Sequence, residues 1–510
     1  MDKMAHRILP RTLAHHTISM RNKLTQIFNS VQTRNALLLA HVLVIALAFI
    51  PSYPPAPDQE TYFALSDGLT LGSFSVWNGI IDPAPQDLLR THGYPVFLYL
   101  VRSVSDQPNV LFAIQSILYF VTLLLIMALL EGGSERMFRQ SIFLLLMLPQ
   151  FQLVYYIHQV FPETLMALLC AWFVRRSLEG RPGAGPLIGT GILAAVLFWV
   201  RPVMLFLPLF MIILDLVFAP QRVAQFKRNA GVFFLFVLFG PLPFACWNLS
   251  THGTFMPIPL SGSAVNSNLG IWQLRLPGYG TMHYFQYNYF GREFLPLVSE
   301  DEAAAYYEEY QTQWVRIEKE SANAMTEEDR RNQVAMDGRK TALYATRSPA
   351  YTMALNDAIA KENTAMIKAD PFYYLGSRCY AAVRLWVTNI NMPMEKVVYE
   401  PTPGVRPIVG KPTGMGGWAA ALVPFLLTVI TFGLGLPLVV WSVLRDPGWW
   451  RPRRYVLYMI CYVWFVHIPM SIQSRYTVPV HALAIACVTW AIVTWRPSTE
   501  RKARTEEGLA

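Results

Sequence analysis

Carboxylate and guanidinium groups cluster at the ends of apolar segments in this sequence, where they could do chemistry at a membrane surface. Asp58 and Glu60 follow the first apolar segment, and Glu163 begins a later one. Arg201 and Arg475 each lie in a tight turn between two apolar segments. Charged groups at the edge of a membrane are costly, so their placement is the best available indication of function. These separate pieces of chain could converge on a single cavity.

The spacing and types of these residues suggest transfer chemistry. Asp58 and Tyr62 are spaced i, i+4 and share one helix face, while Glu60 points elsewhere. One of the two carboxylates could act as a general base while the other orders the loop. A phosphate leaving group needs cationic stabilisation at neutral pH, which arginine supplies well. We therefore expect attack on a lipid-phosphate-linked group. The predicted site residues are Asp58, Glu60 and Glu163 as catalytic groups, Arg201, Arg475, Arg90 and His92 as donor-phosphate ligands, and Tyr62, Tyr94, His158 and Tyr476 as supporting groups.

Each of these residues also has a purely structural interpretation. The acidic residues follow a proline at an expected helix start, where they stabilise the helix dipole by about a few tenths of a kcal/mol. Arginine side chains at a membrane edge also extend to lipid phosphates without any catalytic role. His41 and His467 lie within apolar segments and are expected to be packed core histidines.

The composition identifies the class of protein. Of the 510 residues, 53% are apolar and 15% are charged, whereas a soluble domain carries about 25% charged residues. The apolar residues fall in blocks of about 15 to 25, the length that crosses a bilayer. This pattern excludes a soluble enzyme and a disordered protein, and the five cysteines show no metal or redox spacing. We therefore predict an all-α polytopic membrane protein.

About ten transmembrane helices are expected. They are predicted at residues 36–51, 109–130, 140–157, 161–178, 186–200, 203–219, 231–249, 417–443, 455–470 and 477–495. The first outer loop is expected to hold two helices at the membrane surface, and the long extracytoplasmic loop is expected to be mostly helical. The predicted organisation is a cytoplasmic segment 1–35, a transmembrane bundle 36–250 with the first outer loop at 51–108, the long loop 251–416, C-terminal transmembrane helices 417–495 and a cytoplasmic tail 496–510.

The basic residues support one orientation of these helices. With the N-terminus and C-terminus in the cytoplasm, the cytoplasmic segments hold 22 Lys and Arg residues, and the short outer segments hold four. The other 16 lie in the long loop, where the positive-inside rule does not apply. The formal net charge of +9 is therefore mostly a topology signal, and we expect no nucleic-acid partner.

Several motifs resemble those of the GT-C glycosyltransferases, in particular the bacterial aminoarabinose transferases and the protein mannosyltransferases. The segments DQETYFALSDGLTLGSFS and RTHGYPVFLYLVRSVS resemble the first outer loop of that family. Later motifs follow in matching order, namely PETLMALL, WVRPVMLFLPL, PLPFACWNLSTHGTFMPIPLSG, ADPFYYLGSRCYAAVRLW and SRYTVPVHALAIA. The resemblance touches most of the chain, although each motif is short.

The resemblance implies a GT-C-like fold and a membrane glycosyltransferase. Such an enzyme moves a sugar from a polyprenyl-phosphate donor to a lipid, glycan or protein acceptor. Asp58 matches the catalytic acidic position of the family, and Arg90 or His92 falls near a basic residue that touches the donor phosphate in some members. Glu163, Arg201 and Arg475 match recurring motifs whose roles vary between branches.

Two departures limit what the resemblance implies. Aminoarabinose transferases usually have a basic residue and a Pro-Pro pair ahead of the second surface helix, where this chain reads HGYP, so transfer of their substrate does not follow. Some branches bind a divalent metal through an acidic pair, which Asp58 and Glu60 could form. Other branches need no metal, and we predict no cofactor here.

Other functions remain open at this stage. A polysaccharide polymerase or ligase also uses lipid-linked glycans, but such proteins rely on Arg and His in outer loops. A lipid-linked glycan transporter should place ionisable residues near the bilayer middle and show broken helices in paired positions. In a structural or assembly protein, the cluster of charged residues would have no catalytic role. The expected location is the bacterial inner membrane, in the cell envelope, with the active site facing the periplasm.

Overall fold

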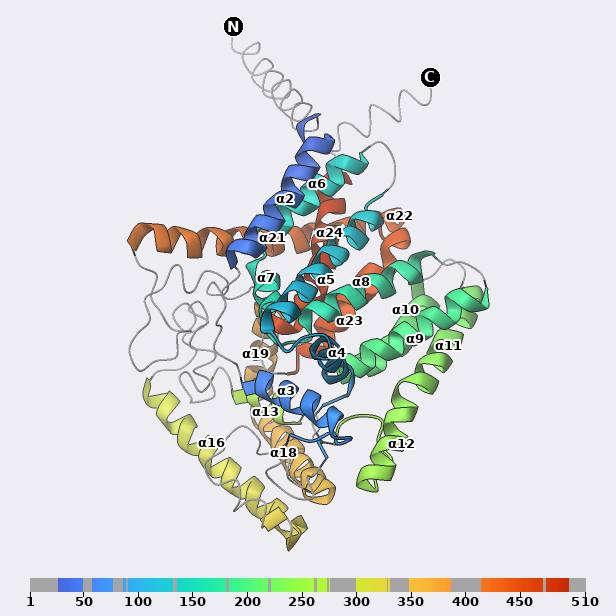
Figure 1. Cartoon of the computed structure of the whole chain (residues 1–510). Helices are drawn as coiled ribbons and strands as arrows, with labels where there is room; N and C mark the ends of the chain where they lie inside the picture. Colours follow the sequence, from blue (N-terminus) through green and yellow to red (C-terminus); the bar gives the residue numbers. More distant parts are fainter. Residues whose placement is uncertain are drawn as a thin grey trace.

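The computed structural model of the chain is built from helices, and no strand occurs among the residues that it describes (Figure 1). Those residues are 26–48, 57–76, 86–88, 90–131, 135–179, 183–218, 222–260, 264–272, 275, 300–327, 329–330, 348–386, 414–470 and 474–494. The predicted segment 1–35 is thus described only in part, and the predicted tail 496–510 lies outside the described residues.

Each predicted span overlaps a helix or a pair of helices in the described residues, with bounds that differ by several residues in some cases. They are α2 (Val31–Ala48), α5 (Pro108–Leu129), α6 (Arg136–Met147) with α7 (Phe151–Ile157), α8 (Glu163–Glu179), α9 (Ala184–Val200), η1 (Pro202–Phe206) with α10 (Leu207–Phe218), α11 (Arg222–Phe239) with α12 (Pro241–His252), α21 (Gly414–Arg445), α23 (Arg454–His467) and α24 (Val478–Thr494). Among the residues that the structure describes, three helical stretches are long and apolar enough, by length and composition, to cross a membrane, namely Pro108–Leu129, Val223–His252 and Leu426–Arg445. The predicted all-α, polytopic membrane fold is confirmed.

Three of the predicted spans are not single α-helices, and one of them, 203–219, begins with the 3-10 helix η1 before α10. The span 140–157 is interrupted between α6 and α7, where Pro149 has no backbone N–H to continue the helix. The span 231–249 is interrupted at Gly240, and α12 restarts at Pro241, whose fixed φ suits the first position of a helix. The interruptions near Pro149 and Pro241 have the same cause, because proline ends one helix or begins the next.

Apolar side chains cover the outside of the bundle, as expected for a surface that contacts lipid. A soluble monomer rarely exposes large apolar patches, because water contact with such surfaces is unfavourable. In this chain a single helix, α21, exposes Val423, Leu426, Leu427, Ile430, Leu434, Val440, Trp441 and Leu444. The exposed apolar face agrees with an integral membrane protein.

The last helix lies at the centre of the bundle. Almost every residue of α24 is buried, including Val478, His481 and Trp490. It packs against α5, α6, α8, α21 and α23 (Figure 1). A helix that is apolar on all sides must be surrounded by other elements, which explains why α24 carries no amphipathic pattern.

Shorter helices gather at the end of the bundle that the orientation predicted from the basic residues would place outside, which we call the outer end (Figure 1). They are α3 (Pro57–Thr70), α4 (Gly93–Arg102), α13 (Ala264–Trp272), α16 (Glu300–Ser321), α18 (Pro349–Ala369) and α19 (Pro371–Arg384). In the described residues of these two segments, the helical character predicted for the first outer segment and for the long loop is thus confirmed.

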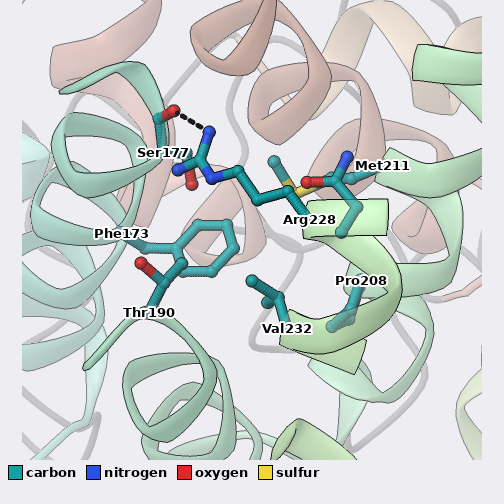
Figure 2. Close-up of a pocket in the computed structure, with 8 residues that line it drawn as sticks. Phe173, Ser177, Thr190, Pro208, Met211, Arg228 and Val232 are labelled. Carbon is teal, nitrogen blue, oxygen red and sulfur yellow. Dashed lines mark hydrogen bonds between the residues drawn. The ribbon is translucent and has the colours of Figure 1, made fainter. Parts of the chain in front are cut away.

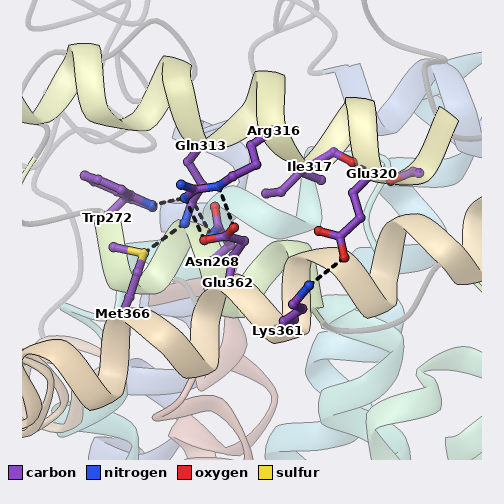
Figure 3. A network of polar contacts seen from close by, with 10 residues as sticks. Asn268, Trp272, Gln313, Arg316, Ile317, Glu320, Lys361, Glu362 and Met366 are labelled. Atoms are coloured by element: carbon purple, nitrogen blue, oxygen red, sulfur yellow. Dashed lines mark hydrogen bonds and ion pairs between the residues drawn. The ribbon is translucent and has the colours of Figure 1, made fainter.

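A buried polar network holds the helices of the long loop together (Figure 3). Asn268 Nδ2 on α13 donates hydrogen bonds to Gln313 Oε1 on α16 at 3.2 Å and to Asn363 Oδ1 on α18 at 2.7 Å. Trp272 Nε1 donates to the same Gln313 oxygen at 2.8 Å. Buried polar groups that are hydrogen-bonded to one another fix a unique packing arrangement, so α13 is held in a defined place against α16 and α18.

A second polar network joins α10, α11 and α23 at the opposite end of the bundle. The fully buried Asp215 accepts hydrogen bonds from Asn229 Nδ2 at 2.8 Å and from the Tyr455 hydroxyl at 2.7 Å. Its other carboxylate oxygen pairs with Arg454 Nε at 3.3 Å. A buried carboxylate is tolerated only when it is paired and hydrogen-bonded, so these residues hold the three helices together.

Gly93 docks the start of α4 onto the end of α9. A Cβ atom at this position would lie 2.5 Å from the carbonyl carbon and oxygen of Trp199 and 2.6 Å from the amide nitrogen of Val200. Only glycine allows two backbones to approach this closely. The glycine of the HGYP motif therefore sets the segment that precedes α4 beside Arg201, which follows Val200 directly.

We predict that Gly93→Ala lowers the thermal stability of the protein in detergent. The added methyl group meets backbone atoms that cannot rotate away, and overpacking of this kind costs about 1–3 kcal/mol. Gly376→Ala in α19 is the matched control, because nothing lies within 4 Å of its added Cβ. Equal Tm values for the two variants would contradict the proposed close contact.

Candidate functional site

The turn that leads into α8 forms the base of the candidate site. Gln115 on α5 fixes this turn, because its Nε2 donates to the carbonyl oxygens of Ile157 at 3.0 Å and Gln159 at 2.8 Å. Pro162 then precedes Glu163, the first residue of α8, whose side chain is fully buried. An acidic group at a helix N-terminus is stabilised by the helix dipole, which offsets part of the cost of burial.

A buried ion pair joins this turn to the end of α9. Arg201 Nη2 donates to Glu163 Oε1, and the exposed fractions of the two side chains are 14% and 0%. Arg201 has an extended backbone (φ −143°, ψ 115°), because α9 ends at Val200 and Pro202 begins the next helical turn. The predicted proximity of Glu163 and Arg201 is therefore seen directly.

Tyr94 lies beside this ion pair. Its side chain is fully buried, and burial, together with the nearby Tyr62 and Glu163, raises the pKa of Tyr94 well above its usual range. Neither the Tyr94 hydroxyl nor Glu163 Oε2 has a hydrogen-bond partner among the described residues. The site therefore holds a neutral hydroxyl and a carboxylate oxygen that other described side chains leave available.

Aromatic contacts connect the segment before α4 to α3. The rings of Tyr62 and Tyr94 meet edge to face, with their centroids 4.9 Å apart. The Arg90 guanidinium lies 5.3 Å from the centre of the Tyr62 ring, and the Arg90 amide donates to Asp87 Oδ1 at 2.7 Å. A series of contacts thus links Arg90 to the ion pair of Glu163 and Arg201. The Arg90 guanidinium lies near the Tyr62 ring, Tyr62 contacts Tyr94, and Tyr94 lies beside Glu163.

Arg475 also lies at the turn that leads into α8. It belongs to η6 (Ser474–Tyr476), and its guanidinium lies 5.3 Å from the centre of the Phe161 ring and 5.8 Å from that of Tyr476. Tyr476 in turn stacks on His467, with centroids 4.5 Å apart and an interplanar angle of 22°. Because Phe161 lies two residues before Glu163, turns more than 270 residues apart in the chain meet here.

The first turn of α3 also contacts the turn that leads into α8. Gln59 Nε2 donates to Gln159 Oε1, and both side chains are buried. Asp58 precedes Gln59 on the same helical turn, but its side chain lies outside the described residues. Glu60 is exposed. The structure therefore places the backbone of Asp58 next to the turn before α8.

Two predicted histidines have surroundings that suit packing. His92 lies in a box of aromatic rings, 3.9 Å from Phe74, 4.5 Å from Trp247 and 5.6 Å from Trp199 between centroids. Burial lowers the pKa of His92 to about 4, so the imidazole is neutral at pH 7 and supplies no charge to a phosphate. His158 Nδ1 contacts the Val154 carbonyl oxygen at 3.1 Å. We leave both histidines out of the phosphate site proposed below.

Three buried glutamines near this site were not predicted from the sequence. Gln59, Gln115 and Gln159 link α3, α5 and the turn before α8 through buried amides. The available signal was an uncharged polar residue inside an otherwise apolar run, as in FAIQSIL around Gln115. No group of three His, Cys, Asp or Glu side chains that could hold a metal ion occurs in the part of the chain that the structure describes.

A pocket far along α8 does not belong to this site (Figure 2). It is lined by Phe173, Ser177, Thr190, Pro208, Met211, Arg228, Asn229 and Val232. Its volume of roughly 10 Å³ holds about one water molecule. Arg228 donates to the carbonyl oxygens of Ser177 at 3.0 Å and Arg176 at 3.2 Å, so this arginine caps the C-terminal end of α8.

Comparison with known proteins gives two solved structures. The first is ArnT from Cupriavidus metallidurans bound to undecaprenyl phosphate, with 11% identity and a TM-score of 0.38 over 88% of this chain and 77% of that one. The second is the archaeal oligosaccharyltransferase AglB from Archaeoglobus fulgidus in complex with an inhibitory peptide and a dolichol-phosphate. It has 14% identity and a TM-score of 0.42 over 94% of this chain, which spans 52% of its length.

No family model matches the chain, and no curated protein matches it. The two similar structures have low identity and TM-scores below 0.5. The function proposed below therefore rests on the side chains of the site.

We predict that Glu163→Gln destabilises the protein strongly. Removing the carboxylate leaves the Arg201 charge without its buried partner, which costs about 3–5 kcal/mol. Glu179→Gln is the control, because Glu179 pairs with Arg175 at the surface and an exposed pair contributes less than about 1 kcal/mol. Thermal unfolding in one detergent measures both, and a Glu163→Gln variant as stable as the control would contradict the buried pair.

Proposed function

We propose that this protein is a glycosyltransferase that moves a sugar from a polyprenyl-phosphate donor to a lipid, glycan or protein acceptor. The reaction takes place at the outer end of the bundle, on the periplasmic face of a bacterial inner membrane. The observation that carries the proposal is the convergence of Arg201 and Arg475 on the turn between Phe161 and Glu163, next to the start of α3.

The two arginines are the proposed ligands of the donor phosphate. A guanidinium group has five N–H donors, and the ion pair with Glu163 uses one terminal nitrogen of Arg201. The Arg475 guanidinium lies close to the Phe161 and Tyr476 rings, which place its positive charge at the turn before Glu163. Arg90, over the Tyr62 ring, is a third candidate.

Glu163 has a positioning role in this proposal, although the sequence suggested a catalytic one. Its contact with Arg201 fixes the guanidinium at the end of α9. Tyr94 remains a neutral donor beside Glu163, because burial raises its pKa. A neutral hydroxyl can donate a hydrogen bond to a phosphate oxygen or to a sugar hydroxyl without adding negative charge to the site.

Asp58 is the proposed general base. The acceptor hydroxyl approaches the first turn of α3, Asp58 takes its proton, and the acceptor oxygen bonds to the anomeric carbon of the sugar. The bond from that carbon to the phosphate oxygen breaks, and its electron pair leaves with the polyprenyl phosphate. Arg201 and Arg475 stabilise the charge that develops on the leaving group. We propose no bound metal for this chemistry.

We predict that Asp58→Asn abolishes sugar transfer in a folded protein. Loss of a general base lowers the rate by about 10²–10⁴-fold. The measurement is release of polyprenyl phosphate from radiolabelled polyprenyl-phosphate sugars by purified protein in nanodiscs, with an acceptor extract present. Asp67→Asn is the control, because Asp67 lies on the same helix but forms an exposed ion pair with Arg102 at 2.6 Å.

Two results would contradict this proposal. One is an Asp58→Asn variant that transfers sugar at the rate of the Asp67→Asn control. The other is folded wild-type protein that releases polyprenyl phosphate from none of the donors. That second result would favour the polymerase, ligase or transporter functions considered from the sequence.

A further inference from the structure

Arg378 on α19 is buried between the outer helices and the bundle. Its Nη1 donates to the carbonyl oxygens of Ile468 at 2.9 Å and Met470 at 2.8 Å, and its Nη2 donates to the Gly270 carbonyl oxygen. Only 6% of the residue is exposed. One side chain thus bridges a helix of the long loop and the chain that follows α23.

The charge of Arg378 is balanced by carbonyl dipoles. Within the described residues, none of the ion pairs involves this arginine. Its backbone acceptors are Gly270 in the last turn of α13, Ile468 at the C-cap of α23 and Met470 in the turn that follows, and its Nε donates to the neighbouring Ser377 Oγ at 3.2 Å. Carbonyl groups at the C-terminal end of a helix lack partners within the helix. These ends carry the negative pole of the helix dipole, so one buried cation caps two helices at once.

Gly270 makes this arrangement possible. A Cβ atom at this position would lie 2.5 Å from the Met470 carbonyl oxygen and 2.9 Å from Arg378 Nη1. The backbone of α13 therefore touches the chain after α23 directly, and any side chain at position 270 would push the two apart.

The bridged segment leads into the proposed phosphate site. Ile468 follows His467, and the His467 ring stacks on Tyr476, the neighbour of Arg475. On the other side, α13 is anchored to α16 and α18 by Asn268 (Figure 3). A continuous set of contacts thus runs from the core of the long loop to the arginine beside Phe161.

We propose that Arg378 is a positioning residue that seats the outer helices on the turn carrying Arg475 and so forms the donor-phosphate site. This inference rests on the proposed function only for the identity of the ligand. Arg378 touches no reacting atom, and it acts through the carbonyl groups of Ile468 and Met470. The long loop and the phosphate site would then form together.

The test uses full-length protein in nanodiscs, with Arg378→Gln, Arg378→Lys and Gly270→Ala as variants. Arg316→Gln is the matched control, because Arg316 also belongs to the outer helices but forms a surface ion pair with Glu362 at 2.7 Å. The first readout is amide hydrogen exchange in residues 474–480, measured by mass spectrometry without any donor. The second is KM and kcat for a radiolabelled polyprenyl-phosphate sugar.

We expect faster exchange in residues 474–480 for Arg378→Gln and Gly270→Ala, and exchange like that of the wild type for Arg316→Gln. KM for the donor should rise at least about tenfold, with a smaller change in kcat, because displaced binding groups weaken donor binding. The exchange rate and KM of Arg378→Lys should lie between those of the wild type and Arg378→Gln, because an ammonium group can contact fewer of the three carbonyl oxygens. If Arg378→Gln does not fold, Gly270→Ala still tests the proposal, because it disturbs the same contact and leaves Arg378 in place.

Unchanged exchange and unchanged KM in folded Arg378→Gln or Gly270→Ala would overturn the positioning role. Equal effects in the Arg316→Gln control would also overturn it, because they would reflect general loosening of the outer helices. Faster exchange together with a wild-type protein that accepts no donor would support the positioning role and reject the proposed function instead.

Discussion

The buried ion pair between Glu163 and Arg201 is the interaction on which the outer end of this protein depends. Glu163 is fully enclosed, so its charge must be matched where it lies. The opposite charge comes from Arg201 at the end of α9, so this ion pair fixes α8 and α9 relative to each other. Tyr94 then packs beside the carboxylate, and Tyr62 packs on Tyr94, so the surface helices are placed by the same pair.

Close backbone contacts complete this arrangement at two glycines. Gly93 brings the start of α4 against α9, and Gly270 brings α13 against the chain after α23. Each contact lies next to an arginine that matters for the site, Arg201 in the first case and Arg378 in the second. The charged groups are therefore held by the backbone as well as by their partners, which suits the proposed presentation of positive charge to a donor phosphate.

Much of this fold could be predicted from the sequence, because apolar blocks and the positions of basic residues are strong signals in a membrane protein. The convergence of Glu163, Arg201 and Arg475 followed from their shared position at the outer ends of the segments. The buried amides of Gln59 and Gln159 could not be predicted, since an uncharged residue gives no topology signal. The packing of His92 against Trp199 and Trp247 depends on contacts between segments more than 100 residues apart, which no local pattern reveals.

The central claim is that the outer arginines bind a lipid phosphate, and direct binding tests it best. Native mass spectrometry with undecaprenyl phosphate would compare the wild type with an Arg201→Gln, Arg475→Gln double variant. The exposed arginines at the opposite end, changed as Arg445→Gln with Arg451→Gln, provide a control that removes the same charge. We predict that the outer double variant loses the bound lipid and the control keeps it. Equal binding by both variants would contradict the account.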